Sequence, residues 1–357
     1  MGIPIVYFRS SSFNAHRMCP MQAYIEYTLG IKGDSGKAAC KGTITHKMLE
    51  ICAVCKKAMQ DGETKIQDKE IGEVLTAEYS PEYLNEICAR VYKHYSSHMT
   101  YHEWKPKDEK DCTAWAWKAL EYNKGMFDPM NRTLVDAEPY FDFIIEEDWA
   151  KYSYPKYNLE GHLGIKGTID LITDIGDGMY EIIDWKTGQR KDWATGKTKD
   201  QSNMASDPQL RIYHYACKKM YPHVNSFLFT LFFINHGGPF TVHFQDSDLQ
   251  KTEEILRKKF EAIKKTEEPR LCRQIDPKNG WKCKRLCHYG KTTFEDHDTI
   301  KSQLERRPGQ YTRYNQKRSK CEQIRYMIKR KGIEWVTDNY IDPNHSIGEY
   351  REPGGTE

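Results

Sequence analysis

The 357-residue chain has no long apolar run, and no stretch reaches the ~18 consecutive apolar residues that a membrane-spanning helix needs. Its first ten residues lack the basic start and apolar run of a secretory signal. Internal repeats, low-complexity linkers and a G-x-x-x-x-G-K-[ST] loop are also missing, so neither a repeat protein nor a helicase motor is expected. The formal net charge of only +3 says little about partners, so the distribution of particular residues must carry the argument.

Cysteine is abundant although no secretory signal is present. The chain has eleven cysteines, which in a chain without export would remain free thiols in the reducing cytoplasm. Cys52 and Cys55 form a C-x-x-C pair within a helical pattern that runs from residue 46 to 59, so we expect them to pack in a core.

Three ionisable residues stand on two short apolar segments that have the β-branched composition of half-buried strands. Asp170 lies on the first segment, and Asp184 and Lys186 lie two residues apart on the second. The connecting residues are rich in glycine and aspartate, which favour turns. A three-residue turn centred on Asp177 would place Asp170 opposite Asp184, and Lys186 would share the face of Asp184.

Such a group can carry out metal-assisted hydrolysis. Two carboxylates bind a hard cation such as Mg²⁺ or Mn²⁺, which polarises a phosphate and lowers the pKa of bound water. Lys186 could hold or deprotonate that water. A solvated hairpin face with an incidental ion pair is the alternative, and further motifs are needed to decide.

Two further motifs carry polar side chains at helical spacing. Asp207 and Pro208 suit the N-cap and first position of a helix, which would place Gln209 and Tyr213 on one face. Upstream, His46 stands at the start of an amphipathic stretch. A single histidine is more commonly a structural residue, so its meaning depends on the set.

Taken in order, these motifs resemble the PD-(D/E)XK nuclease superfamily, in its RecB-like branch. That branch carries a G-x-x-x-H-x-x-L helix, a G-x-x-D strand, a (D/E)-x-K strand and a Q-x-x-x-Y helix. In this chain they read Gly42–Leu49, Gly167–Asp170, Asp184–Lys186 and Gln209–Tyr213. The resemblance implies an α/β fold: a mixed central β-sheet flanked by helices, in a restriction-endonuclease-like core, with a helical N-terminal region and a C-terminal extension. It places a nuclease domain at residues 1–290 and a basic extension at 291–357.

The resemblance also implies roles for individual residues. Lys186 would be catalytic together with the acids, and Gln209 and Tyr213 would orient the lysine and the DNA backbone. The implied metal ligands are His46, Glu138, Asp170, Asp184 and the carbonyl of Trp185. Asp136 and Asp142 compete with Glu138 for the position on the preceding strand.

Four cysteines form a second group. Cys272, Cys283 and Cys287 lie in a polar, loop-like stretch, and Cys19 precedes a proline near the N-terminus. This arrangement resembles the iron–sulfur subgroup of these nucleases, in which four thiolates hold a [4Fe–4S] cluster. The C-terminal gaps here are ten and three residues, whereas relatives usually show a C-x2-C pair and a third cysteine five or six residues later. Structural Zn²⁺, bound by the three C-terminal cysteines with His288 or Cys19, is the alternative.

The segment from residue 301 to 332 is strongly basic, with eleven Lys or Arg and two Glu interleaved with tyrosines. Such a segment can track phosphates and stack bases, although a solvated helix face is the alternative. The predicted DNA contacts are Thr187, Gln209, Tyr213, Arg313, Lys317 and Arg318.

These observations predict a metal-dependent DNA exonuclease that acts at DNA ends in recombination, repair or phage DNA processing. A helicase, an annealing protein or further copies of the chain would be its partners, and no membrane is involved. Alternatives are a structure-specific endonuclease, a DNA-end-binding or recombination scaffold, and a zinc-bound interaction protein; an RNA substrate also stays open.

The pattern of apolar residues predicts the order of the elements. Strands are expected at 134–146, 163–173, 179–186, 226–235 and 239–244, and helices at 42–60, 81–125 and 208–220 and from about 247. Residues 11–30 are expected to form two short helices, the second opened by Pro20. The polar stretch 188–205 is predicted to be a loop beside the site.

Overall fold

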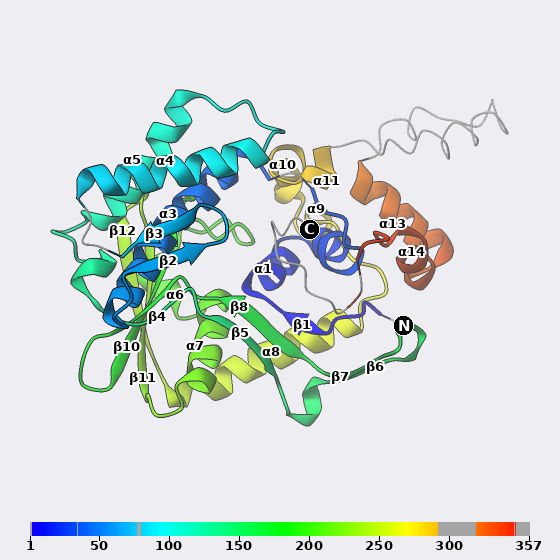
Figure 1. Cartoon of the computed structure of the whole chain (residues 1–357). Coiled ribbons are helices and arrows are strands. Elements are labelled where there is room, and N and C mark those ends of the chain that lie inside the picture. Colours follow the sequence, from blue (N-terminus) through cyan, green and yellow to red (C-terminus); the bar gives the residue numbers. More distant parts are fainter. Residues whose placement is uncertain (1, 34, 77–79, 292–318, 346, 348–357) are drawn as a thin grey trace. The chain divides into compact units, whose positions relative to one another are not determined.

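The computed structural model describes residues 2–33, 35–76, 80–291, 319–345 and 347 (Figure 1). Its contacts divide the chain into two compact units. Unit 1 comprises Met1–Asp34, Phe143–Ile165 and Glu253–Glu357; unit 2 comprises Ser35–Asp142 and Lys166–Thr252. The boundary expected at residue 290 divides the chain once along its sequence, whereas each of these units combines separate segments. That boundary therefore stays a prediction.

A five-stranded mixed sheet forms the centre of unit 2, in the order β12-β11-β10-β9-β4. The central strand β10 pairs parallel with β11 and antiparallel with β9. The strands are β4 (Thr133–Ala137), β9 (Leu171–Asp174), β10 (Met179–Lys186), β11 (Ser226–Phe233) and β12 (Gly238–Gln245). This sheet and its helices confirm the predicted mixed α/β fold.

Helices cover the sheet of unit 2 and build its main core. The helix α3, the longest among the residues that the structure describes, packs on β4 and on the neighbouring helices α4 and α5 (Figure 1). Ile183 and Trp185 of β10 belong to this core, as do Cys52 and Cys55, whose packing role is thereby confirmed. The remaining elements of unit 2 are α3 (Lys37–Gln60), β2 (Lys65–Asp68), β3 (Gly72–Leu75), α4 (Pro81–His98), α5 (Pro106–Leu120), α6 (Gln201–Met204) and α7 (Pro208–Met220).

Three elements expected to be continuous are interrupted. The helix predicted over 81–125 is two helices: α4 ends at His98, and α5 begins only at Pro106, where Lys105 precedes the proline and takes an extended conformation with φ −124° and ψ 154°. The strand predicted over 134–146 breaks at Glu138, whose φ of +53° lies in the left-handed region. The two halves of this strand are β4 and β5 (Tyr140–Ile144). The strand predicted over 163–173 is also divided, into β8 (Gly164–Thr168) and β9.

Unit 1 is mainly helical. Its short strand β1 pairs parallel with the start of β8, at Tyr7 opposite Gly164 and Phe8 opposite Ile165. Pro20 opens α2, as predicted, and a π-helical turn at Tyr24–Thr28 follows. The elements are β1 (Tyr7–Phe8), α1 (Ser10–Met18), α2 (Pro20–Ala23), β6 (Lys151–Tyr154), β7 (Leu159–His162), most of α8 (Leu249–Lys264), α9 (Cys272–Ile275), α10 (Gly280–Arg285), α11 (His288–Lys291), α13 (Lys320–Lys331) and α14 (Ile333–Tyr340). None of the helices in the described ranges is long and apolar enough to cross a membrane.

Candidate active site

The two acids of the hairpin are brought together by its register. β9 and β10 pair with Ile183 opposite Leu171. These pairs confirm the register predicted from a turn centred on Asp177, and Asp170 and Asp184 follow directly after the last pair. That turn is tight because Asp177 and both flanking glycines adopt positive φ angles.

Asp184 is 1% exposed and is held by two side chains of α7. Its Oδ1 accepts a hydrogen bond from Gln209 Nε2 at 2.8 Å and lies 3.3 Å from Tyr213 Oη. Tyr213 Oη also donates to the carbonyl oxygen of Thr168 at 3.0 Å. The resemblance predicts that Gln209 and Tyr213 orient Lys186 and DNA; in the structure both contact Asp184, so any influence on the lysine passes through this carboxylate.

The start of α7 places these two side chains. Asp207 is the N-cap, and its carboxylate accepts a hydrogen bond from the Gln209 backbone N–H at 2.9 Å. Pro208 occupies the first helical position, where its missing N–H costs nothing. Gln209 and Tyr213 are four residues apart on one helical face, and Gln209 Nε2 donates to Tyr213 Oη at 2.9 Å.

Lys186 contributes the positive charge of the site. Its Nζ lies 2.5 Å from Asp184 Oδ2. Burial by itself lowers the pKa of this ammonium, but the negative charges of Asp184 and Asp170 raise the pKa more strongly, so the net shift is upward. Lys186 in this arrangement is therefore a cation and a hydrogen-bond donor rather than a base.

His46 of α3 faces the same carboxylates. Its Nδ1 lies 3.5 Å from Asp170 Oδ2, and the same Oδ2 accepts a hydrogen bond from the Trp185 backbone N–H at 2.9 Å. Burial and the positive charge of Lys186 lower the pKa of His46 to about 4. The imidazole is consequently neutral near pH 7, the state in which it can bind a metal.

Gly42 allows α3 to approach the end of β10. A Cβ on Gly42 would lie 2.6 Å from Thr187 Oγ1, which is much closer than real Cβ atoms come. The glycine of the G-x-x-x-H motif therefore leaves room for a specific neighbour, and the motif's histidine follows one turn later on the helix.

Glu138 is the acid of the preceding strand that turns toward the site. Its left-handed backbone breaks the strand, and its N–H donates to the Asp170 carbonyl at 3.2 Å. Burial, with a further contribution from Asp170, raises the pKa of Glu138 well above its usual range. The two competing acids have other partners. Asp142 forms an ion pair with Lys166 at 2.9 Å, and the Asp136 carboxylate accepts a hydrogen bond from the backbone N–H of Ala137.

The site buries more negative charge than its lysine can balance. Burial and the charge of Asp184 raise the pKa of Asp170 to about 8, despite Lys186. Asp184 Oδ2, also buried, lies close to Lys186 but accepts no hydrogen bond of regular geometry from the described residues. Carboxylate oxygens with a neutral imidazole and excess negative charge fit a hard divalent cation. Across the described ranges, however, no three His, Cys, Asp or Glu side chains stand in the geometry of a formed metal site.

Sequence patterns did not identify Glu50 as a neighbour of the buried carboxylates. Glu50 lies one helical turn after His46, and its charge contributes to the raised pKa of Glu138. Lys47 holds it at 2.7 Å and reaches Asp68 at 2.8 Å on β2. The i, i+4 spacing from His46 was the available signal.

The four cysteines predicted to act together line one cavity in unit 1. Cys272 Sγ lies 3.3 Å from Cys283 Sγ and forms a hydrogen bond with Cys19. A fifth cysteine, Cys321 of α13, also lines this cavity, and sequence reasoning did not select it. The complete lining is Met18, Cys19, Gln22, Leu271, Cys272, Lys282, Cys283, Cys287 and Cys321.

The zinc alternative named His288, whose ring contacts Tyr289 and faces Gly33, where a Cβ would come within 2.6 Å of it. His288 does not contribute to the lining of the thiol cavity, as far as the structure describes it. The predicted DNA contacts Arg313, Lys317 and Arg318 lie outside the described residues.

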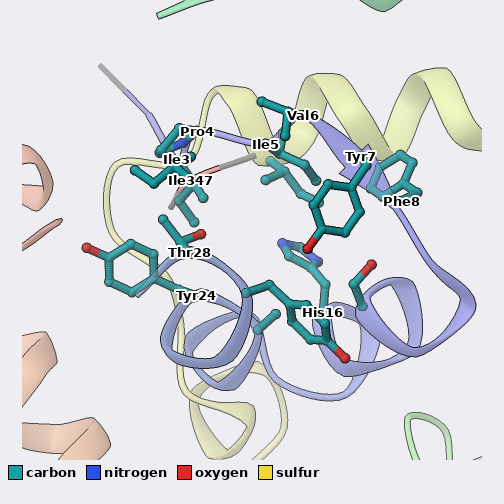
Figure 2. Close-up of a pocket in the computed structure, with 14 residues that line it drawn as sticks. Ile3, Pro4, Ile5, Val6, Tyr7, Phe8, His16, Tyr24, Thr28 and Ile347 are labelled. Carbon is teal, nitrogen blue, oxygen red and sulfur yellow. The ribbon is translucent and has the colours of Figure 1, made fainter. Parts of the chain in front are cut away.

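A different cavity of unit 1 is mostly apolar (Figure 2). The N-terminal segment from Ile3 to Phe8 forms one wall, and the imidazole of His16 points inward. Both ring nitrogens are buried without a hydrogen-bond partner among the described residues, and burial with the charge of Lys259 lowers the pKa of His16 to about 3. The described lining contains no carboxylate.

Comparison with known proteins identifies the superfamily of the chain. Residues 10–292 match the PD-(D/E)XK nuclease superfamily, and the chain belongs to this superfamily. Its members generally use divalent metals. Among solved structures, an exonuclease candidate from Eubacterium rectale is similar to this chain with 11% sequence identity and a TM-score of 0.41, over 82% of this chain and 92% of that one. A search of curated proteins gives no match.

Proposed function

We propose that the chain is a metal-dependent DNA exonuclease of the RecB-like branch, which hydrolyses phosphodiester bonds at DNA ends in recombination, repair or phage DNA processing. The observation that carries this proposal is the convergence of Asp170, Asp184 and Lys186 on one hairpin, with the lysine ammonium 2.5 Å from Asp184. The order of the four sequence motifs supports the RecB-like assignment.

Mg²⁺ or Mn²⁺ would be held by carboxylates and neutral donors of unit 2. The proposed ligands are His46, Glu138, Asp170, Asp184 and the carbonyl oxygen of Trp185. Bound there, the cation would polarise the scissile phosphate and lower the pKa of a water molecule. The raised pKa values of Glu138 and Asp170 support this site, because a cation would relieve the repulsion between buried carboxylates.

The chain's own residues would divide the remaining work. The Lys186 ammonium would hold the attacking water by donating a hydrogen bond and would stabilise the negative charge that develops on the phosphate. Gln209 and Tyr213 would fix the orientation of Asp184. Thr187, Gln209 and Tyr213 are proposed to contact the DNA backbone, with Arg313, Lys317 and Arg318 of the basic extension.

We also propose that the thiol cavity of unit 1 holds a [4Fe–4S] cluster, with structural Zn²⁺ as the alternative. Cys19, Cys272, Cys283 and Cys287 are the proposed ligands, and a cluster or zinc would join both ends of the chain. Their convergence on one buried cavity supports the proposal, since soft thiolates select these metals. All eleven cysteines are free, which is consistent with a reducing compartment such as the cytoplasm.

The proposal is tested by cleavage of end-labelled single strands, end-labelled duplex and a covalently closed circle. Wild-type protein, Lys186→Ala and the control Lys65→Ala, an exposed lysine paired with Glu73 on a peripheral hairpin, are prepared without oxygen. Each is assayed with Mg²⁺, Mn²⁺ or EDTA. We expect metal-dependent loss of the linear substrates only, reduced about 10²–10⁴-fold in Lys186→Ala and unchanged in the control.

Other outcomes would point to other functions. Cutting of the closed circle would indicate a structure-specific endonuclease. Equal DNA binding by wild type and Lys186→Ala, with cleavage by neither, would refute catalysis and leave a DNA-end-binding scaffold. Cleavage of matching RNA strands in the same series would show that the substrate is not restricted to DNA.

A further inference from the structure

All five cysteines of unit 1 line one cavity, whereas the other six cysteines of the chain belong to unit 2. Cys217 illustrates the second class, because it is completely buried and burial alone raises its pKa. Cysteines that merely filled space in unit 1 would be spread over its core. Their collection in one place indicates a shared purpose, and this applies to Cys321 as much as to the others.

Cys321 stands apart from the other four in the sequence. It is the second residue of α13 and lies beyond residue 292, where the match to the superfamily ends. It is 5% exposed, and its Sγ lies 3.3 Å from Ser319 Oγ. Cys283 and Cys287 are close enough for their charges to affect its pKa, which burial raises to about 12.

Positive side chains accompany the thiols. Lys282 is 3% exposed and lines the cavity. Arg273 pairs with Glu322 and lies near enough to Cys283 and Cys321 to interact with their charges. A metal group with four thiolates carries net negative charge, so the buried Lys282 beside it would reduce the cost of its desolvation, and the more exposed Arg273 would add a favourable charge.

We propose that Cys321 supplies a thiolate ligand to the metal group of this cavity and so anchors α13 to that group. This inference rests on the proposal that the cavity binds a [4Fe–4S] cluster or zinc. On binding, the thiol loses its proton to solvent as the sulfur–metal bond forms. Either group takes four thiolates, so Cys321 replaces one of the four cysteines predicted from the sequence.

The first test measures the metal content of cysteine variants in the full chain. Each of the five cavity cysteines is changed singly to alanine, and Cys217→Ala serves as the control that removes an equally buried thiol from unit 2. Iron, zinc and acid-labile sulfide per chain and the visible absorption spectrum are measured without oxygen. We expect four variants, Cys321→Ala among them, to lose more than half of the bound metal, while one cavity variant and the control retain it.

Retention of wild-type metal and spectrum by Cys321→Ala, while Cys287→Ala loses both, would overturn the inference and leave the four-cysteine proposal intact. If wild-type protein takes up neither iron with sulfide nor Zn²⁺, the metal role of the cavity and this inference both fall. The nuclease proposal would stand in either case, because it is tested separately through Lys186.

A second measurement avoids dependence on the folding of the alanine variant. Cys321→Ser keeps a side chain of nearly the same size but removes the sulfur, and Co²⁺ serves as a spectroscopic probe of the cavity. The intensity of the thiolate-to-cobalt charge-transfer bands should fall by about a quarter in Cys321→Ser, since one of four thiolates is lost. Identical bands in wild type and Cys321→Ser would contradict the inference.

Discussion

The carboxylate site of unit 2 and the thiol cavity of unit 1 both gather metal-binding side chains, but they hold them differently. Asp184 is fixed by a neutral partner, the amide of Gln209 at 2.8 Å. In the cavity, the thiol of Cys272 instead forms hydrogen bonds with the thiols of Cys19 and Cys283. Asp184 is therefore oriented by groups that are not proposed to bind metal, whereas Cys272 lies against two other proposed metal ligands.

The two regions also differ in how far their members lie apart in the sequence. Asp170 and Asp184 belong to one hairpin, so a short turn suffices to bring them together. Cys19 and Cys321 come from opposite ends of the chain and meet only when unit 1 has folded. Local patterns can therefore predict the first region in detail and the second only in part.

The largest expected effect in this comparison comes from removing the neutral partners of Asp184. Tyr213→Phe and Gln209→Ala should each lower kcat/KM about 10–100-fold and raise the Mg²⁺ concentration needed for half-maximal rate, because Asp184 loses its orientation. Tyr215→Phe, the same change on the same helix, is the control. Rates and Mg²⁺ titrations equal to wild type in Tyr213→Phe would show that the carboxylate does not depend on this hydroxyl.

A smaller effect should follow from adding a methyl group at Gly42. Gly42→Ala drives a Cβ against Thr187 Oγ1, so we expect a loss of about 1–3 kcal/mol in the free energy of unfolding. Thr187→Ala removes that oxygen. The double variant Gly42→Ala/Thr187→Ala should then regain the lost free energy of unfolding. Its free energy of unfolding should exceed that of Thr187→Ala by up to ~1 kcal/mol, because alanine favours helix more than glycine does. Denaturant titration measures all three; additive losses would disprove the contact.

The smallest expected effect is the dependence of folding stability on pH, to which the two regions contribute differently. The folded-state pKa of Asp170 is about 8, far above the ~3.9 expected when unfolded, so the metal-free folded chain binds an extra proton between these values. Stability from this group is complete at low pH and is lost as pH rises through 8. His46, with a pKa of about 4, acts in the opposite sense, but its contribution is complete near pH 6.5.

In EDTA, the melting temperature should therefore fall by on the order of a few °C between pH 6.5 and 8.5. Asp170→Asn should remove the part of this decline that occurs below about pH 8, and Mg²⁺ should reduce that part because the cation replaces the proton. Cys287 and Cys321, with folded pKa values of about 11 and 12, stay protonated in the folded chain, but their unfolded thiols begin to ionise near pH ~8.5 and so add a smaller decline at the upper end of this range. A decline of equal size in Asp170→Asn, measured by calorimetry, would refute the assignment.

Several details of the site could be predicted because they depend on neighbouring residues alone. The turn at Asp177 fixed the hairpin register, and Asp207 with Pro208 fixed the start of α7. The extended backbone of the residue before Pro106 could also have been predicted, since a residue that precedes proline avoids the helical conformation. The left-handed backbone of Glu138 was not, because such a conformation is held by contacts such as its bond to the Asp170 carbonyl.

The sequence by itself determined the order of the strands and helices around the site, the acids and lysine of the hairpin, and the expectation of a nuclease. Those features follow from side-chain alternation, turn chemistry and capping, which act over a few residues. Only the tertiary structure decided that Gln209 and Tyr213 bond to Asp184, that Glu50 lies near the buried acids, and that Cys321 joins the other thiols. These contacts join residues distant in the chain or depend on which side of a helix is buried, and packing settles such questions through burial and steric fit rather than local preference.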